Sequence, residues 1–571
     1  MGFKIIITRK KLLSGIIILL MFILFQGCNN KGLPYFFHKK QPAVEINISP
    51  PLAGNETLGF FKLDTFKLKE QLNSVFNDTT IWNEEMRGFY QLNDYDLAWI
   101  ERGRLNKNAL VYREQLALAE KDGLERDFYF YREISQLIDS IKKNRISYEK
   151  VMLLEALLTR SYLDYASGLL TGHINPDKLQ FTWVAHPISK NLKGHLSEAL
   201  DKGEIRTSLE VLKPKHVQYE KLKYKLAEYR EIKKNGGWPI ITMKDVLQQG
   251  DTSMYVDTIR KFLYMYDNLV SKSNFGNMVF DDELEKAVKK FQERNGLEVD
   301  GILGNKTYET MSKTIDDRIG QIIINMERIR WIPENFGEKY IIINIPEFVL
   351  RYYEKGDKKL EMKVVVGKIE NYTPVLKDTV DYIVFSPEWR VPNSISREEI
   401  LPAIKKDSDF LARNQYEIYE DWTTSKPLNP DSIPWESLTK DNFTYRIVQK
   451  PGPWNALGRI KFMFPNNYNI YLHDTPQDHL FEEINRDFSH GCVRLEKPFE
   501  LADYLLHDSI GKLDMFEYLE KEEPYTVSLP DKVPVHFIYR TAWCDEKGNI
   551  HFRKDLYKFD KKQLALLRKL G

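Results

Sequence analysis

The segment Tyr471-Leu-His-Asp-Thr-Pro476, followed by Ser489-His-Gly-Cys-Val-Arg494, is the most informative part of this 571-residue chain. It places a histidine and a cysteine, His473 and Cys492, 19 residues apart. The run Asn469-Ile-Tyr-Leu-His473 is short, apolar and alternating, which predicts a strand that ends at the histidine. The segment therefore indicates a β-rich domain whose reactive residues sit where strands end.

The residue types around the cysteine suit chemistry at an acyl group. A thiol attacks a carbonyl well only as the thiolate, so Cys492 needs a base, and His473 is the best candidate. Gly491 lets the backbone approach a substrate closely, and its N–H and that of Cys492 are placed to stabilise a tetrahedral oxyanion. We interpret Ser489 as a hydroxyl that stabilises the loop rather than as a nucleophile.

This pattern resembles the signature of the L,D-transpeptidases with a YkuD-type catalytic domain. The resemblance to the large, multidomain, periplasmic YcbB-like branch extends over most of the chain after about residue 80. It is carried by four further runs, Arg328-Ile-Arg-Trp-Ile-Pro333, Ile343-Asn-Ile-Pro-Glu-Phe348, Val364-Val-Val-Gly367 and Gln449-Lys-Pro-Gly-Pro-Trp-Asn-Ala-Leu-Gly458.

The resemblance implies roles for the neighbouring residues. The backbone carbonyl of Asp474 would orient His473, which leaves the role of the Asp474 side chain open. His490 and Tyr471 would help as donors or in positioning. Arg494 would either bind a stem-peptide carboxylate or hold the cysteine loop. No cofactor or metal is implied, and we expect the rate to depend on an ionisation in the neutral pH range.

In that family, the cysteine attacks the carbonyl at the L-centre of the third residue of a peptidoglycan stem peptide. A thioester forms, and the amine of a second stem resolves it into a 3→3 cross-link. Water as acceptor would make the enzyme an L,D-carboxypeptidase, and a protein lysine would make it an attachment enzyme. The sequence leaves open the acceptor, the third stem residue, the oligomeric state and any protein partner.

Three other interpretations compete with this one. His473, His479, His490 and Cys492 could be zinc ligands, although their spacing matches no compact metal motif. Papain-like cysteine hydrolases usually place the cysteine before the histidine, which is the reverse of the order here. A non-catalytic wall-binding lipoprotein would not need the His/Cys pair.

The amino end predicts export. Basic residues precede an apolar run, Leu12 to Phe25, that stops before Gly27-Cys28, as in a lipoprotein signal over residues 1–28. Lipidation at Cys28 would anchor the protein to a membrane facing the periplasm, through a Pro-containing tether over 29–59. Which membrane is not resolved. The 83 basic and 82 acidic residues nearly cancel, so nothing suggests a nucleic-acid surface.

The chain length and the change of pattern along it predict a multidomain α+β protein. We expect a helical scaffold domain over 60–239, in which His173 is structural, and a small three-helix peptidoglycan-binding-like module over 240–314. Residues 315–337 would be a linker and 338–520 the β-rich catalytic domain, with a capping insert at about 395–450. Residues 521–571 would form a strand and tail that pack on the scaffold.

Overall fold

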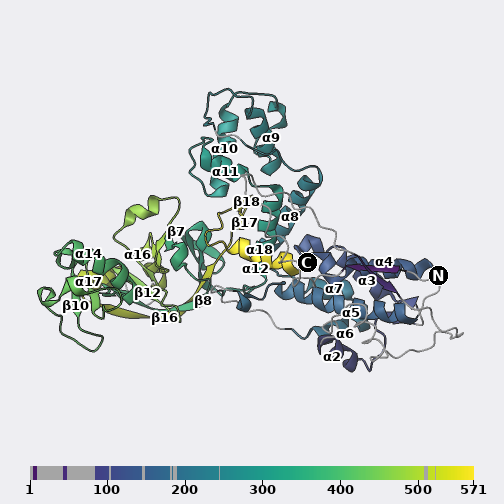
Figure 1. The fold of residues 1–571 in the computed structure, drawn as a ribbon, viewed down its shortest axis with the longest axis horizontal. Coiled ribbons are helices and arrows are strands. Elements are labelled where there is room, and N and C mark those ends of the chain that lie inside the picture. The colour runs from purple at the N-terminus through teal and green to yellow at the C-terminus, as the bar shows by residue number, and fades with distance from the viewer. Residues whose placement is uncertain are drawn as a thin grey trace, which may run out of the picture. The chain divides into compact units, whose positions relative to one another are not determined.

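The chain divides into two compact units (Figure 1). A computed structural model describes residues 4–8, 43–47, 84–101, 104–143, 148–179, 183, 190–242, 245–506, 512–520 and 522–570. The first unit comprises Met1–Ile174, Ile188–Pro214 and Ala565–Gly571, and the second comprises Asn175–Pro187 and Lys215–Leu564. The first is mainly helical and the second combines helices with a large sheet, so the predicted multidomain α+β class is confirmed.

The predicted export signal and tether lie almost wholly outside the described residues, and so does Cys28. Within those ranges the structure describes two strands, β1 (Lys4–Thr8) and β2 (Ala43–Asn47), which pair antiparallel. Across the described ranges, no helix has the length and apolar character that crossing a membrane requires. Export and lipidation therefore stay predictions.

The first unit is built around one long helix, α5 (Tyr148–Thr171). Its side chains are buried on nearly every side, and its Glu155 carboxylate accepts hydrogen bonds from the backbone N–H groups of Ala98 and Trp99 at 2.7 and 3.0 Å. His173 shares a 2.7 Å hydrogen bond with the Tyr129 hydroxyl. The surrounding helices are α2 (Glu84–Leu92), α3 (Lys107–Leu116), α4 (Tyr131–Lys143), α6 (Leu192–Lys202) and α7 (Ile205–Glu210).

A three-helix module lies in the second unit, within the range expected from the sequence. Its helices are α9 (Val256–Asp267), α10 (Asp282–Asn295) and α11 (Asn305–Met311). The Gln292 side chain explains the Gly-punctuated loop after α10, because it accepts from the Gly301 N–H at 2.9 Å and donates to the Asp300 carboxylate at 2.7 Å. The module is therefore organised by a buried amide rather than by its helices alone.

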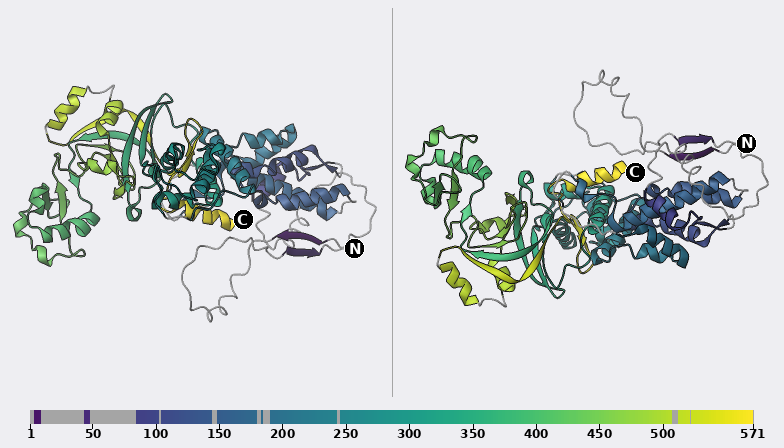
Figure 2. Two further views of the ribbon diagram at one scale, coloured as in Figure 1. Left: turned by 90° about the horizontal axis from the view of Figure 1, so that it is seen from above. Right: turned by 90° about the horizontal axis from the view of Figure 1, so that it is seen from below.

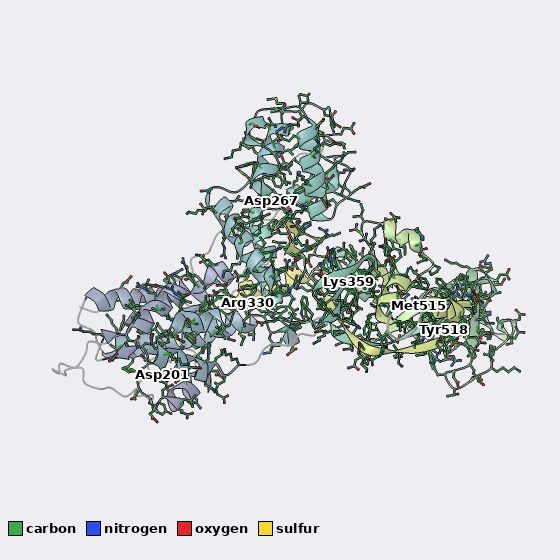
Figure 3. All side chains as sticks on the ribbon, turned by 180° about the vertical axis from the view of Figure 1, so that it is seen from behind. Asp201, Asp267, Arg330, Lys359, Met515 and Tyr518 are labelled. Atoms are coloured by element: carbon green, nitrogen blue, oxygen red, sulfur yellow. The ribbon has the colours of Figure 1, made fainter. Side chains whose placement is uncertain are left out.

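The expected linker at 315–337 is wrong, because most of it is a packed helix, α12 (Ile315–Ile329). A capping box between Thr314 and Asp317 starts this helix. Its apolar face joins one core with the three-helix module and with α8 (Val217–Lys234), which we had assigned to the scaffold range. At its end, the buried Arg330 donates to the Tyr219 hydroxyl at 2.9 Å (Figure 3).

The β-rich part of the second unit is a nine-stranded sheet in the order β14-β7-β15-β13-β12-β8-β16-β5-β6. An additional pairing of β6 with β7 closes the strands into a ring. The strands are β5 (Lys339–Asn344), β6 (Val349–Glu354), β7 (Asp357–Gly367), β8 (Lys377–Phe385), β12 (Ile460–Met463), β13 (Leu472–His473), β14 (Asp487–Ser489), β15 (Val493–Leu495) and β16 (Tyr525–Ile538). Two helices, α16 (Pro498–Leu506) and α17 (Lys512–Glu520), follow β15.

Only part of the expectation that residues 521–571 pack on the scaffold is wrong, because Ala565–Gly571 belong to the helical unit whereas the residues before them do not. Strand β16 pairs parallel with β5 and antiparallel with β8, so it lies inside the large sheet. Beyond it, the hairpin of β17 (Ala542–Cys544) and β18 (Ile550–Phe552) joins the core of α8 and α12. The tail ends in α18 (Phe559–Leu570).

The insert forms a small body of its own in the ribbon (Figure 2). Its buried residues make a separate apolar core. It begins at β9 (Trp389–Arg390) and returns at β11 (Arg446–Gln449), and these two strands pair antiparallel. Between them lie a π-helical turn (Ser396–Ile400), α13 (Asn393–Ile395), α14 (Leu401–Lys406), α15 (Phe410–Arg413) and β10 (Tyr416–Tyr419). The polar, Pro-rich second half is therefore folded around residues such as Ile433 and Phe443.

Candidate active site

Parallel pairing of β13 with β15 brings the two motif segments together. Leu472 lies opposite Val493 and His473 opposite Arg494, and the Val493 N–H donates to the Tyr471 carbonyl at 3.2 Å. Side chains alternate between the two faces of a sheet. Leu472 and Val493 point into the core, so Tyr471, His473, Cys492 and Arg494 share the opposite face.

His473 is held in the form that a general base needs. Its side chain is 4% exposed, and its Nδ1 lies 2.6 Å from the Asp474 carbonyl oxygen. A proton on Nδ1 donated to that carbonyl leaves Nε2 as the acceptor. Burial, followed by the charge of Arg494, lowers the pKa of His473 to about 3. The imidazole is therefore neutral at physiological pH.

The Asp474 side chain has a structural task that the sequence left open. Its carboxylate accepts from the Arg459 N–H at 2.7 Å and packs against Gly458, where a Cβ would come within 2.3 Å of it. Gly458 also has a φ of +61°, which favours glycine. Asp474 therefore fixes the turn that leads into β12, while its carbonyl holds the imidazole.

Cys492 is half-buried, and its thiol lies 3.6 Å from the Asn469 carbonyl oxygen. Burial raises the pKa of this thiol to about 11, although the backbone N–H and the hydroxyl of Tyr471 oppose that shift. The Cys492 thiol and the His473 imidazole are thus both neutral in the resting protein. The expectation of an ionisation in the neutral range is not supported by these pKa values.

Tyr471 lies between Cys492 and the insert. Its hydroxyl lies near the Cys492 thiol and near the Trp389 side chain at the start of β9, since both groups act on its pKa. Burial raises the pKa of Tyr471, so the group stays a phenol. The Lys461 ammonium lies 5.8 Å from the centre of the same ring. Side chains from β9 and β12, Trp389 and Lys461, therefore surround Tyr471.

The loop before Cys492 is fixed by Ser489. The Ser489 hydroxyl donates to the Cys492 carbonyl at 2.6 Å and accepts from the Gly491 N–H at 3.1 Å. We had expected the Gly491 N–H to stabilise an oxyanion, but here it serves the loop. Gly491 has a φ of +117°, a conformation that side chains rarely adopt.

A chain of hydrogen bonds from the tail supports this loop from behind. The Tyr557 hydroxyl donates to the Gly367 carbonyl at 2.6 Å, and the Thr373 hydroxyl donates to the Gly491 carbonyl at 2.8 Å. Gly367 and Gly491 are packed backbone to backbone, since a Cβ on Gly367 would lie 3.0 Å from the Gly491 Cα. Gly367, Thr373 and Tyr557 thus hold the backbone of the 489–492 loop in place.

Two polar side chains of the motif have partners outside it. His490 Nε2 lies 2.6 Å from a carboxylate oxygen of Glu399, which belongs to the insert. Arg494 donates to the Gln477 side-chain oxygen at 2.5 Å, which ties it to the loop after β13. The contact favours the loop-holding role of Arg494 over the carboxylate-binding role.

Sequence reasoning missed several residues that surround the site. Lys461, Asn469, Thr373, Trp389, Glu399 and Tyr557 lie in four segments far apart along the chain. Lys461 carried one signal, because it lies in the strand that precedes the histidine strand. Asn469 lies in the same run as His473, so the sequence placed it nearby without indicating a role. Thr373, Trp389, Glu399 and Tyr557 become neighbours of the site only through the sheet order and the insert, which no local pattern encodes.

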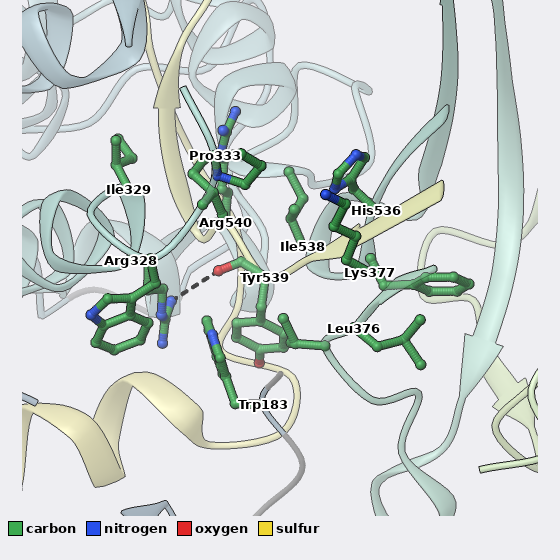
Figure 4. A pocket seen from close by; sticks show the side chains of 14 residues that line it. Trp183, Arg328, Ile329, Pro333, Leu376, Lys377, His536, Ile538, Tyr539 and Arg540 are labelled. Atoms are coloured by element: carbon green, nitrogen blue, oxygen red, sulfur yellow. Dashed lines mark hydrogen bonds between the residues drawn. The ribbon is translucent and has the colours of Figure 1, made fainter. Parts of the chain in front are cut away.

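The described residues show no metal-binding cluster, and the cavity beside α12 is too small for a peptide. Among the described residues, no group of three or more His, Cys, Asp or Glu side chains is placed to hold a metal ion. A cavity of about 40 Å³ lies between α12, β8 and β16, lined by Trp183, Arg328 and Tyr539 among others (Figure 4). That volume holds a few water molecules rather than a peptide.

Three family models match separate parts of the chain. Residues 338–529 match the L,D-transpeptidase catalytic domain called YkuD. Residues 84–226 match a model called "Scaffold domain", and residues 256–311 match a "Putative peptidoglycan binding domain". The His/Cys pair and most of the large sheet lie in the first match, helices α2 to α7 in the second, and the three-helix module in the third.

Two curated relatives match parts of the chain. The chain is 37% identical over 243 residues to a "Putative L,D-transpeptidase" of Haemophilus influenzae, covering 42% of this chain. The match spans 48%, about half, of that relative's length. A second match, 36% identical over 76 residues, is to the N-acetylmuramoyl-L-alanine amidase CwlM of Mycobacterium tuberculosis, covering 12% of this chain and 19% of that relative.

Solved structures also match. An L,D-transpeptidase (Yku) from Stackebrandtia nassauensis has 13% sequence identity and a TM-score of 0.20, over 52% of this chain and 96% of that chain. An L,D-transpeptidase from Xylanimonas cellulosilytica has 14% identity and a TM-score of 0.17, over 52% and 98%. Scores this low add nothing to the family matches.

The two pKa values predict how the thiol reacts with pH. Because the folded pKa of Cys492 is about 11 and that of His473 about 3, the thiol should stay protonated and the imidazole neutral between pH 5 and 9. The alkylation rate of Cys492 by iodoacetamide should rise about tenfold per pH unit through pH 9, as the thiolate fraction grows. Mass spectrometry distinguishes Cys492 from the buried Cys544. A plateau with a midpoint between pH 5 and 8 would instead reveal a thiolate–imidazolium pair.

Proposed function

We propose that this chain, whose residues 338–529 form an L,D-transpeptidase catalytic domain of the YkuD type, is a peptidoglycan L,D-transpeptidase that works through a Cys492 thioester. The observation that carries the proposal is the arrangement of three groups. The thiol of Cys492 and the imidazole of His473 share one sheet face, and the Asp474 carbonyl holds the imidazole with Nε2 as the acceptor.

The reaction begins at the carbonyl of the L-centre in the third stem residue. The Cys492 sulfur forms a bond to that carbon while His473 Nε2 takes the thiol proton, because the neutral pair transfers it as attack proceeds. The carbonyl oxygen becomes an oxyanion, for which the Cys492 N–H is the backbone donor in our scheme. The C–N bond then breaks, and His473 returns the proton to the leaving amine of the D-residue.

The second half of the reaction resolves the thioester. An amine of another stem attacks the thioester carbonyl, His473 takes one of its protons, and the C–S bond breaks to return the thiol. The product is a 3→3 amide cross-link. Water in place of the amine gives L,D-carboxypeptidase activity, and a protein lysine gives attachment of that protein. Mass spectrometry of muropeptides incubated with the pure protein distinguishes these products.

Substitution of the two described cysteines tests the thioester. We expect Cys492→Ala to abolish cross-linking and the covalent adduct with a stem peptide, because no other nucleophile faces His473 in our scheme. Cys544→Ala should keep both within about threefold. Cys544 is 2% exposed, its thiol is free, and it packs in the hairpin of the tail. Intact-mass spectrometry after substrate addition measures the adduct.

Equal loss of activity in the two variants would contradict the proposal and point to a coupled role of both thiols. Circular dichroism of each variant provides the folding control. A wild-type chain that binds peptidoglycan but never forms an adduct or product would favour the alternative of a non-catalytic wall-binding protein.

The three-helix module is proposed to hold the chain on peptidoglycan. Its core is continuous with α8, α12 and the tail hairpin, so the test uses the full chain rather than the isolated module. A chain with exposed module residues changed, Met254→Ser together with Tyr255→Ser, should co-sediment less with insoluble sacculi. Activity on soluble stem peptides should not change. If co-sedimentation stays unchanged after further surface substitutions across the module, the module does not bind peptidoglycan and serves only as a spacer.

The insert is proposed to be a cover that keeps water from the thioester until an amine arrives. It contacts the site at two points, where Glu399 meets His490 and where Trp389 meets Tyr471. Because Arg390 lies opposite Val448, residues 393–444 can be replaced by a short Gly-Ser turn that keeps β9 and β11 paired.

We expect this replacement to preserve the fold and to slow acylation by a complete stem about tenfold or more, or to shift products from cross-link toward hydrolysis. Iodoacetamide, which is small, should still reach Cys492 at least as fast. Glu399→Gln serves as the milder control, since it weakens only the contact with His490. An unchanged rate and an unchanged product ratio in a folded replacement would show that the insert is no cover.

A further inference from the structure

Three strands place a row of charged and titratable side chains across the site. Arg494 on β15 lies opposite His473 on β13, and His473 lies opposite Lys461 on β12. Residues paired in register project from the same face of a sheet, and neighbouring strands are about 4.8 Å apart. The base therefore stands between two cations, and Cys492 lies beside this row on the β15 side.

The two cations differ in what they contact. Arg494 donates to Gln477 at 2.5 Å and is engaged with its own loop. Lys461 is half-buried, and among the described residues no carboxylate comes within ion-pair distance of its ammonium group. Placing an ammonium in such a position costs free energy unless it meets an anion. Lys461 is thus the cation of the row that is available to a substrate.

The charges around Lys461 show that it faces the reacting groups. Its charge acts on both the Cys492 thiol and the His473 imidazole, and its ammonium lies over the Tyr471 ring. Burial and the charge of Arg390 lower the pKa of Lys461, whereas Glu388 and Cys492 raise it. Arg390 belongs to β9, where the insert begins, so a further cation lies near Lys461 at the start of the insert.

We propose that Lys461 binds the carboxylate of the D-residue that leaves, and so makes the enzyme select stems that end one residue beyond the scissile bond. The inference rests on the proposed function. It assigns a specificity-determining residue on β12, outside the His473–Cys492 motif.

The order of atoms in the substrate matches the order of strands. The scissile carbonyl carbon must meet Cys492, and the leaving nitrogen must meet His473, which returns its proton. The carboxylate of the leaving residue is two bonds beyond that nitrogen. Continuing across the sheet in the same direction leads from β13 to β12, where Lys461 lies. A charge-assisted hydrogen bond there would fix the leaving residue while its amine is protonated.

The test compares two tetrapeptide stems that differ only at the end, one with a free C-terminal carboxylate and one with a carboxamide. For the wild-type full chain, kcat/KM of thioester formation should favour the acid about 10- to 100-fold, the range expected for one charge-assisted hydrogen bond. Lys461→Gln should lose that preference by slowing the acid alone. Lys461→Arg should keep most of it.

Two controls separate binding of the substrate from effects on the nucleophile. Lys532→Gln changes an exposed lysine of β16 in the same sheet and should leave both substrates unaffected. Iodoacetamide alkylation of Cys492 in Lys461→Gln should stay within about threefold of wild type. Equal slowing of acid and amide in Lys461→Gln would overturn the inference, because Lys461 would then act on Cys492 or His473.

The failure of this inference is distinguishable from failure of the proposed function. If the wild-type chain forms no adduct with either stem, the transpeptidase proposal itself is wrong. If it forms adducts with both stems at equal rates, the transpeptidase proposal stands and the role of Lys461 is refuted.

Discussion

The pairing of Leu472 with Val493 decides where every reacting group of this protein lies. These two apolar side chains point into the core, so their neighbours are forced onto the other face of the sheet. A shift of this pairing by one residue would place His473 and Cys492 on opposite faces of the sheet. Burial of Leu472 and Val493 therefore fixes the register between β13 and β15. That register in turn fixes the face on which the adjoining residues Tyr471 and Cys492 lie.

Desolvation then sets the resting state of the site. Burial pushes the pKa of the thiol up and that of the imidazole down, so neither group carries charge before a substrate arrives. A neutral thiol resists adventitious oxidation and alkylation better than a thiolate does. The Asp474 carbonyl supplies orientation without adding a negative charge, which would raise the imidazole pKa and favour an ion pair.

The sequence predicted the parts of this protein that local patterns encode. The strand ending at His473, the cysteine loop and the Gly-punctuated loop of the module all follow from neighbouring residues. Residues 315–337 were misjudged as a linker, although Thr314 and Asp317 form a capping box before an apolar helical repeat. The partners of His490 and Tyr471 could not be predicted, because Glu399 and Trp389 meet them only through the folded insert.

The middle of the catalytic sheet is completed by a strand from near the end of the chain, β16. It lies between β8 and β5, which come from residues 377–385 and 339–344, yet it is made only after residue 524. Such long-range parallel pairing forms slowly, because a large loop must close before the contacts compensate for the entropy lost. Until β16 arrives, β5 and β8 cannot be joined, and the nucleophile loop lacks the support of Tyr557. A chain whose synthesis stops before residue 525 would thus carry an intact His/Cys motif and still be unable to complete the sheet that holds it.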